Sequence, residues 1–137
     1  MSDEDFLAAL ESCTLAERDF GHSAHVRAAY LYLRSRGFAA ALEKIQSAIQ
    51  RYAASRGKPD RYHETITVAS LALIQQVLHE RGDAGGWQAF SRSNPQLLQR
   101  DLLLQYYPQA QLDSELARRV FLLPRSPNPP AHSIEAP

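Results

Sequence analysis

The stretch FAAALEKIQSAIQRY, residues 38–52, decides the fold class of this chain. Its apolar residues recur at intervals of four, three, four and three positions, at Phe38, Leu42, Ile45, Ile49 and Tyr52. On an α-helix of about 3.6 residues per turn this spacing forms one narrow apolar stripe, which is the side that packs against other helices. The sequence therefore predicts an amphipathic helix over 38–56, ended by the glycine and proline that follow it.

Helical periodicity continues on both sides of this stretch, whereas strand signals are nearly absent. The chain has no alternating β-branched runs and no Asn-Gly or Asp-Gly hairpin turns. Asp60 is placed to cap one helix, Asn94 is placed to cap another, and a capping-box pattern begins at Thr14. We expect helices or helical turns at 3–11, 14–17, 22–36, 38–56, 61–81, 87–90, 94 to 106 or 107, and 111–121.

These elements predict a compact all-α fold, a bundle of three main helices with shorter C-terminal helices packed across them. The main helices are those at 22–36, 38–56 and 61–81, and their short loops favour antiparallel neighbours. A chain of 137 residues is long enough for one domain, which we expect over 1–123. The proline-rich tail 124–137 is expected to be extended or disordered.

Composition narrows the classes of partner. Fifteen Lys and Arg residues balance fifteen Asp and Glu residues, so charge gives no reason to expect nucleic acid or an anionic membrane. Cys13 is the single cysteine, so neither an intrachain disulfide nor a thiolate metal cluster is available. The acidic N-terminus does not look like a signal peptide, and no apolar stretch is long enough to span a bilayer. We expect a cytoplasmic protein with a small-molecule substrate, while its oligomeric state stays open.

Three of the five histidines fall on the side of their helix that should face the core. At about 100° per residue, His22 and His25 lie within the apolar arc of their helix. His63 lies in the middle of the apolar arc of a later helix, whereas His79 lies on the solvent side and His132 lies in the tail. All three inward histidines belong to the first turn of their predicted helix.

Three inward imidazoles predict a metal site, provided that the starts of the two helices lie side by side. His22 and His25 are three positions apart, so they are neighbours on the helix surface and can chelate one ion. With His63 as third ligand, an open fourth position would take water, O₂ or a substrate, and Zn, Cu or Fe fits such a set. Asp60 is either a further carboxylate ligand, which would favour iron, or only an N-cap. The predicted function is a metal-dependent enzyme of redox, oxygen or hydrolytic chemistry.

Neighbours of His63 complete the predicted site. Glu64 would orient a ligand or transfer protons from the rim, and Tyr62 and Thr67 would shape the pocket. Two alternatives stay open. In one, the histidines form a buried structural cluster in a metal-free interaction or accessory module. In the other, a metal-free binding protein or acid–base enzyme uses His63 and Glu64 directly.

Several blocks of the sequence resemble a widespread, functionally uncharacterised family of small all-helical bacterial proteins. The blocks are FGHSAHVRAAYLYL (20–33), YHETITVA (62–69), NPQLL (94–98), YYP (106–108) and LARRVFLLP (116–124), so the resemblance covers most of residues 20–124. The family pattern is an H-x-x-H-V-R start followed by a Y-H-E-T-x-T block. It is matched by His22, His25, Val26, Arg27, Tyr62, His63, Glu64, Thr65 and Thr67. The resemblance implies a shared helical bundle with a site at these positions, and it implies no particular substrate.

Overall fold

The computed structural model describes residues 1–125, and over this range the chain consists of helices and their connections, without strands. The predicted all-α fold is therefore confirmed. Apart from residues 124 and 125, the predicted proline-rich tail lies outside the described residues. None of the helices within the described range is both long and apolar enough to cross a membrane.

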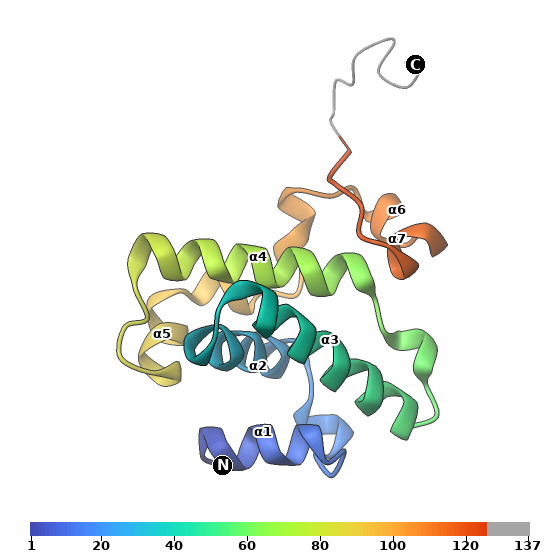
Figure 1. Ribbon diagram of the computed structural model, residues 1–137. Helices are drawn as coiled ribbons and strands as arrows, with labels where there is room; N and C mark the ends of the chain where they lie inside the picture. Colours follow the sequence, from blue (N-terminus) through green and yellow to red (C-terminus); the bar gives the residue numbers. More distant parts are fainter. Residues whose placement is uncertain (126–137) are drawn as a thin grey trace.

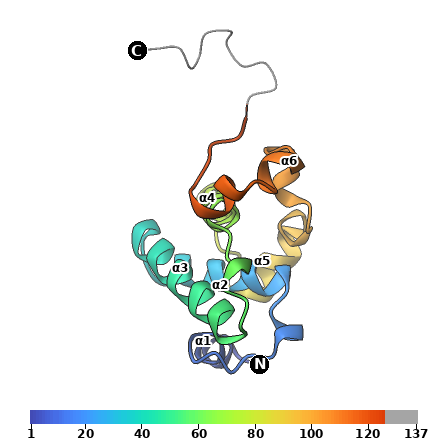
Figure 2. The same ribbon diagram turned by 90° about the vertical axis from the view of Figure 1, so that its right-hand side faces the viewer.

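Three main helices pack pairwise against one another, as Figures 1 and 2 show. They are α2 (His22–Ser35), α3 (Phe38–Ser55) and α4 (Glu64–Arg81). The most enclosed of them is α2, whose residues 28–33 are all buried because α3, α4, α5 (Trp87–Ser93) and the segment after α5 contact it. The predicted bounds of α2 and α3 agree with the structure to within one residue.

The first helix, α1 (Asp3–Glu11), packs against α3 and lies at the bottom of Figure 1. Its apolar side buries Phe6 and Leu10 in the main core. Polar contacts join α1 to α2 as well, because Tyr32 donates its hydroxyl to the Glu11 carboxylate at 2.6 Å. The N-terminal helix is thus part of the bundle.

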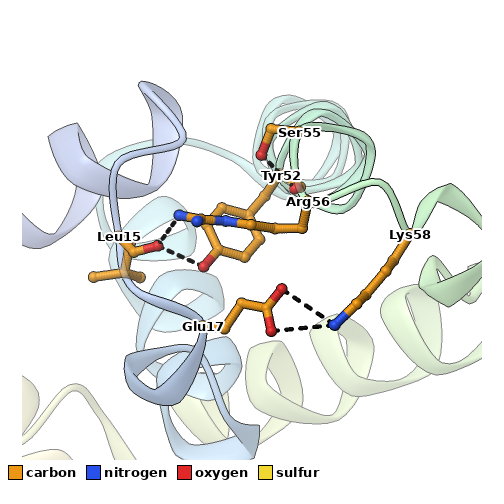
Figure 3. A network of polar contacts seen from close by, with 6 residues as sticks. All are labelled: Leu15, Glu17, Tyr52, Ser55, Arg56 and Lys58. Carbon is orange, nitrogen blue, oxygen red and sulfur yellow. Dashed lines mark hydrogen bonds and ion pairs between the residues drawn. The ribbon is translucent and has the colours of Figure 1, made fainter.

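The loop after α1 is tied to the end of α3 by a polar network (Figure 3). The Tyr52 hydroxyl donates to the Leu15 carbonyl at 2.5 Å, and the Arg56 guanidinium donates to the same oxygen. Beside them, Lys58 pairs with Glu17 at 3.2 Å. This network fixes the chain just before α2. The predicted ligands His22 and His25 lie in the first turn of that helix.

Two predicted helix starts were wrong. Thr14 caps no helix, since its hydroxyl lies 3.4 Å from the Ala9 carbonyl and the next helical turn is η1 (Glu17–Asp19). Asp60 does not cap α4 either, because it lies within its own short turn, η2 (Pro59–Arg61). The N-cap of α4 is His63, whose Nδ1 accepts from the Ile66 backbone N–H at 3.1 Å. A ring nitrogen therefore replaces the carboxylate that the sequence pattern suggested.

The predicted helix from 94 to about 107 is two separate turns, η3 (Pro95–Leu98) and η4 (Leu102–Gln105). The reason is that Leu97 and Leu102 are buried in the main core, whereas Leu103 is buried in a second cluster with Tyr107 and Leu112. On one straight helix Leu97 and Leu102 would point about 140° apart, so a continuous helix would not bury both in the main core. The chain instead turns at residues 99–101, which brings Arg100 beside the main bundle.

The predicted final helix over 111–121 is also divided, into α6 (Gln109–Leu112) and α7 (Glu115–Arg119). Between them the Ser114 hydroxyl accepts from the Ala117 backbone N–H at 3.1 Å, which makes Ser114 the N-cap of α7. A serine that caps one helix competes with continuation of the helix before it. Both short helices lie beside α4, at the upper right of Figure 1.

Candidate functional site

A cavity of about 300 Å³ lies among the three main helices. Each of them supplies aliphatic side chains to it: Val26 and Ala29 from α2, Ile45 and Ile49 from α3, and Ile66, Leu71 and Ile74 from α4. Its other lining residues are Gly21, His22, His25, Thr67, Ser70 and Arg100. We call this space the His25 cavity. It is an apolar chamber with a few polar groups, which is the usual composition of a small-molecule site.

His25 has a fixed tautomer. A carbonyl oxygen only accepts, so Nδ1 carries the proton that bridges 2.9 Å to the Gly21 carbonyl, and Nε2 of the neutral ring is left as an acceptor. Nε2 has no hydrogen-bond partner within residues 1–125. Among the described residues, Arg56 Nε is the one fully buried side-chain nitrogen or oxygen without a partner, so Nε2 of His25 is accessible. Desolvation lowers the pKa of His25 below its ordinary value of 6.5, although the Gly21 bond acts in the opposite direction.

Aromatic packing fixes the plane of the His25 ring. Phe20 stacks on it with ring centroids 4.0 Å apart, and Tyr52 meets Phe20 edge-on at 4.8 Å. Tyr52 is itself held by its bond to the Leu15 carbonyl in the network of Figure 3. The imidazole is therefore positioned by α3 and by the loop before α2, as well as by its own helix.

His22 is the first residue of α2 and reaches the C-terminal half of the chain. Its Nε2 donates to the Leu97 carbonyl at 3.0 Å, which ties α2 to η3. His22 lines the His25 cavity and also a neighbouring space of about 450 Å³. This second space, which we call the His63 hollow, lies between α4 and the C-terminal turns and is lined by His22, Arg61, His63, Ile66, Ser70, Arg100, Asp101, Leu102, Leu103, Leu104, Gln109, Leu112, Asp113 and Arg118.

His63 is buried and both of its ring nitrogens are occupied. Nδ1 caps α4 by accepting from the Ile66 N–H, and Nε2 donates to the Leu112 carbonyl at 2.7 Å. In this arrangement His63 has no nitrogen left for a metal ion. Its chemistry is that of a structural histidine, which starts one helix and holds α6 against it.

Tyr62 and Glu64 line neither the His25 cavity nor the His63 hollow. The Tyr62 hydroxyl donates to one Glu64 oxygen, and Gln46 of α3 donates to the other at 2.9 Å. Burial, followed by the bond to the Glu64 carboxylate, raises the pKa of Tyr62. This trio lines a surface groove of about 690 Å³ between α3 and α7, together with Asp60 and other residues, and His25 is not among them.

The predicted site residues are therefore divided. His22, His25 and Thr67 line the His25 cavity, where the Thr67 hydroxyl donates to the His63 carbonyl at 2.8 Å. Within residues 1–125 no three His, Cys, Asp or Glu side chains are grouped so that they hold a metal ion. The three-histidine metal centre stays a prediction, and in this structure the residues do not fit it, because His63 is committed to the backbone.

Sequence reasoning missed Arg100, Ser70 and Phe20. Ser70 and Phe20 had usable signals, since Ser70 falls on the inner arc of α4 and Phe20 precedes the histidine pair. Arg100 had none, because its place beside α2 depends on the turn between η3 and η4, which was predicted as helix.

Comparison with known proteins adds no family. No family model, curated protein or solved structure matches the chain. The resemblance to small bacterial helical proteins thus stays a prediction, and function is argued from the site alone.

Proposed function

We propose that this protein binds a small, mainly apolar molecule in the His25 cavity, where His25 accepts a hydrogen bond or a proton from it. The observation that supports the proposal is the accessible Nε2 of a tautomerically fixed imidazole that lines a mainly aliphatic chamber. A base of lowered pKa in an apolar pocket is the arrangement that proton-transfer and binding sites share. This is the metal-free alternative, with His25 in the role that the sequence favoured for His63.

The test uses 1-hexanol as a neutral probe of the cavity. We expect saturable chemical-shift changes in the methyl groups of Val26, Ile49 and Ile74 in a ¹H–¹³C NMR titration of the full chain. Ala29→Leu fills the cavity and should abolish them, whereas Ala39→Leu, on the exposed part of α3, should leave them unchanged. Should Ala29→Leu fail to fold, Ile49→Phe serves as the second cavity-filling variant. Absence of saturable shifts in the wild type, or identical shifts in the cavity-filling variant, would overturn the proposal.

The metal-dependent enzyme is the second candidate, favoured by the fact that His22 and His25 line one cavity. It requires His63 to give up one of its two bonds, either the N-cap bond at Nδ1 or the bond from Nε2 to the Leu112 carbonyl. Elemental analysis of untagged protein separates the two, with His79→Ala, an exposed histidine on α4, as control. The metal site requires stoichiometric metal in the wild type and in the control, and loss of that metal in His25→Ala and in His63→Ala. This result would establish the metal-dependent function in place of the metal-free binding function.

A further inference from the structure

We infer that the ligand of the His25 cavity is a small monocarboxylic acid, whose carboxylate pairs with Arg100 while its apolar part occupies the aliphatic chamber. The inference rests on the proposed function and adds the chemical class of the ligand. It is carried by the position of Arg100, by the distribution of charge around it and by the size of the cavity.

Arg100 is placed where two spaces meet. It lines the His25 cavity and the His63 hollow, and His22, Ile66 and Ser70 are the other residues common to both. Within residues 1–125 its guanidinium forms no ion pair and donates no hydrogen bond. Exposed arginines without partners are common on protein surfaces, but this one borders an apolar chamber that His25 also lines. Its five donors are therefore free for a ligand.

The charges around Arg100 favour an anion. Neither Asp nor Glu lines the His25 cavity. The His63 hollow has three arginines, Arg61, Arg100 and Arg118, against the two carboxylates of Asp101 and Asp113. Arg118 donates to the Asp60 carbonyl at 2.9 Å and Asp113 accepts from the Gln109 amide at 2.8 Å, so both contacts are with neutral groups and the excess of one positive charge is kept. A ligand that enters from the hollow thus meets a net positive edge.

Arg100 is also the side chain of the cavity that stays charged at every physiological pH. Burial favours the neutral form of His25, so the imidazole offers an acceptor where a carboxylate would need a donor. A carboxylate placed against His25 would face the lone pair of Nε2, whereas at Arg100 it meets a bidentate donor. The acid group is therefore expected at the Arg100 end, with the apolar part toward Ile49 and Ile74.

The size of the cavity limits the ligand. A cavity of about 150 Å³ holds one benzene molecule, so about 300 Å³ accommodates a short alkyl or a single-ring acid. A long-chain fatty acid would exceed it. Hexanoate and 1-hexanol are therefore matched probes, because they share a six-carbon chain and differ in the charged head group.

The experiment compares the affinities of hexanoate and 1-hexanol for the full chain by isothermal titration calorimetry at pH 7.5 and low salt. We expect hexanoate to bind about tenfold to hundredfold more tightly, the range that a charge-assisted hydrogen bond supplies. Arg100→Gln should remove this advantage and leave 1-hexanol binding within about twofold. Arg61→Gln is the matched control, because Arg61 lines the hollow without lining the cavity.

The outcomes distinguish this inference from the proposed function. Equal binding of both probes, or an unchanged preference in Arg100→Gln, overturns the carboxylate assignment and leaves the cavity as a binding site. An equal loss in Arg61→Gln and Arg100→Gln also overturns it, since a diffuse positive field would then explain the preference. Absence of binding by either probe overturns the proposed function itself.

Discussion

The ring of His63 joins two helices, and its replacement tests whether that role is structural. His63→Ala removes the N-cap of α4 and leaves the Leu112 carbonyl without its donor. We expect the free energy of unfolding to fall by about 2 to 4 kcal/mol, from a lost cap and an unsatisfied buried group. His63→Asn keeps a cap acceptor, so its loss should be about 1 to 2 kcal/mol.

Urea denaturation measures both values, with His79→Ala as the control. His79 is exposed on the same helix, and its replacement should change stability by less than about 0.5 kcal/mol. If His63→Ala were no more destabilising than this control, the structural role would be contradicted, and His63 would be available as a ligand after all.

His25 gives stability a pH dependence of defined sign. Because desolvation holds its folded-state pKa below the ordinary 6.5, the unfolded chain binds the proton more readily. The contribution of neutral His25 to the free energy of unfolding is complete above about pH 6.5 and is lost as the pH falls through the folded-state pKa. An NMR titration of the Cε1 proton of His25 should show a midpoint below 6.5. A midpoint at or above that value would mean that the cavity does not desolvate the ring.

Among the contacts of α4 with the C-terminal turns is one buried hydroxyl, that of Thr65. Thr65 donates to the Val120 carbonyl at 2.8 Å and accepts from the Leu122 N–H at 3.1 Å. Thr65→Val keeps the shape and removes both bonds, so we expect a loss of about 1 to 3 kcal/mol. Hydrogen exchange should accelerate in α6 and α7 and stay unchanged in α2.

Thr67→Val is the matched control for this prediction. Its hydroxyl donates to the His63 carbonyl one turn earlier, within the same helix region. The substitution should therefore leave the exchange of α6 and α7 amides as it is in the wild type. Equal acceleration in both variants would show that Thr65 does not hold the C-terminal turns.

The sequence predicted elements well where a helix carries one continuous apolar stripe. The stripe from Phe38 to Tyr52 is such a case, and α3 agrees with its predicted range almost fully. Prediction failed where burial is divided between two clusters, because the chain turns so that Leu102 joins Leu97 in the main core while Leu103 packs in the second cluster. Neither the division nor the turn at Arg100 leaves a periodic signal, because both depend on contacts with distant parts of the chain.

The candidate site was predictable in part, because the periodicity of a helix shows which residues lie on its apolar side. The inward arcs included His22 and His25, and both histidines line a cavity. They also placed His63 inward, and it is buried. A helical wheel cannot say which nitrogen a carbonyl will occupy, and the bonds of His63 to Ile66 and Leu112 decide its role. The wheel also could not show that Glu64 lies apart from the His25 cavity, in the groove beside α7.

For the whole molecule, ligand binding and unfolding should be linked. A ligand that binds only the folded state raises the free energy of unfolding, by about 2.7 kcal/mol at a hundredfold excess over its Kd. Hexanoate should therefore raise the urea midpoint of the wild type and leave the denaturant slope unchanged. Ala29→Leu should show no such rise. An equal rise in that variant would assign the effect to salt or to surface binding.

The bond between His22 and Leu97 spans 75 residues of chain, and this has a consequence for synthesis. A ribosome adds about 5 to 20 residues per second, so Leu97 is made about 4 to 15 s after His22. During that interval the apolar face of α2 lacks one of its covers, although α1 is made before it and α3 directly after it. We expect the nascent chain to be most susceptible to aggregation and to chaperone binding in this interval, which closes when the turns around Arg100 leave the exit tunnel.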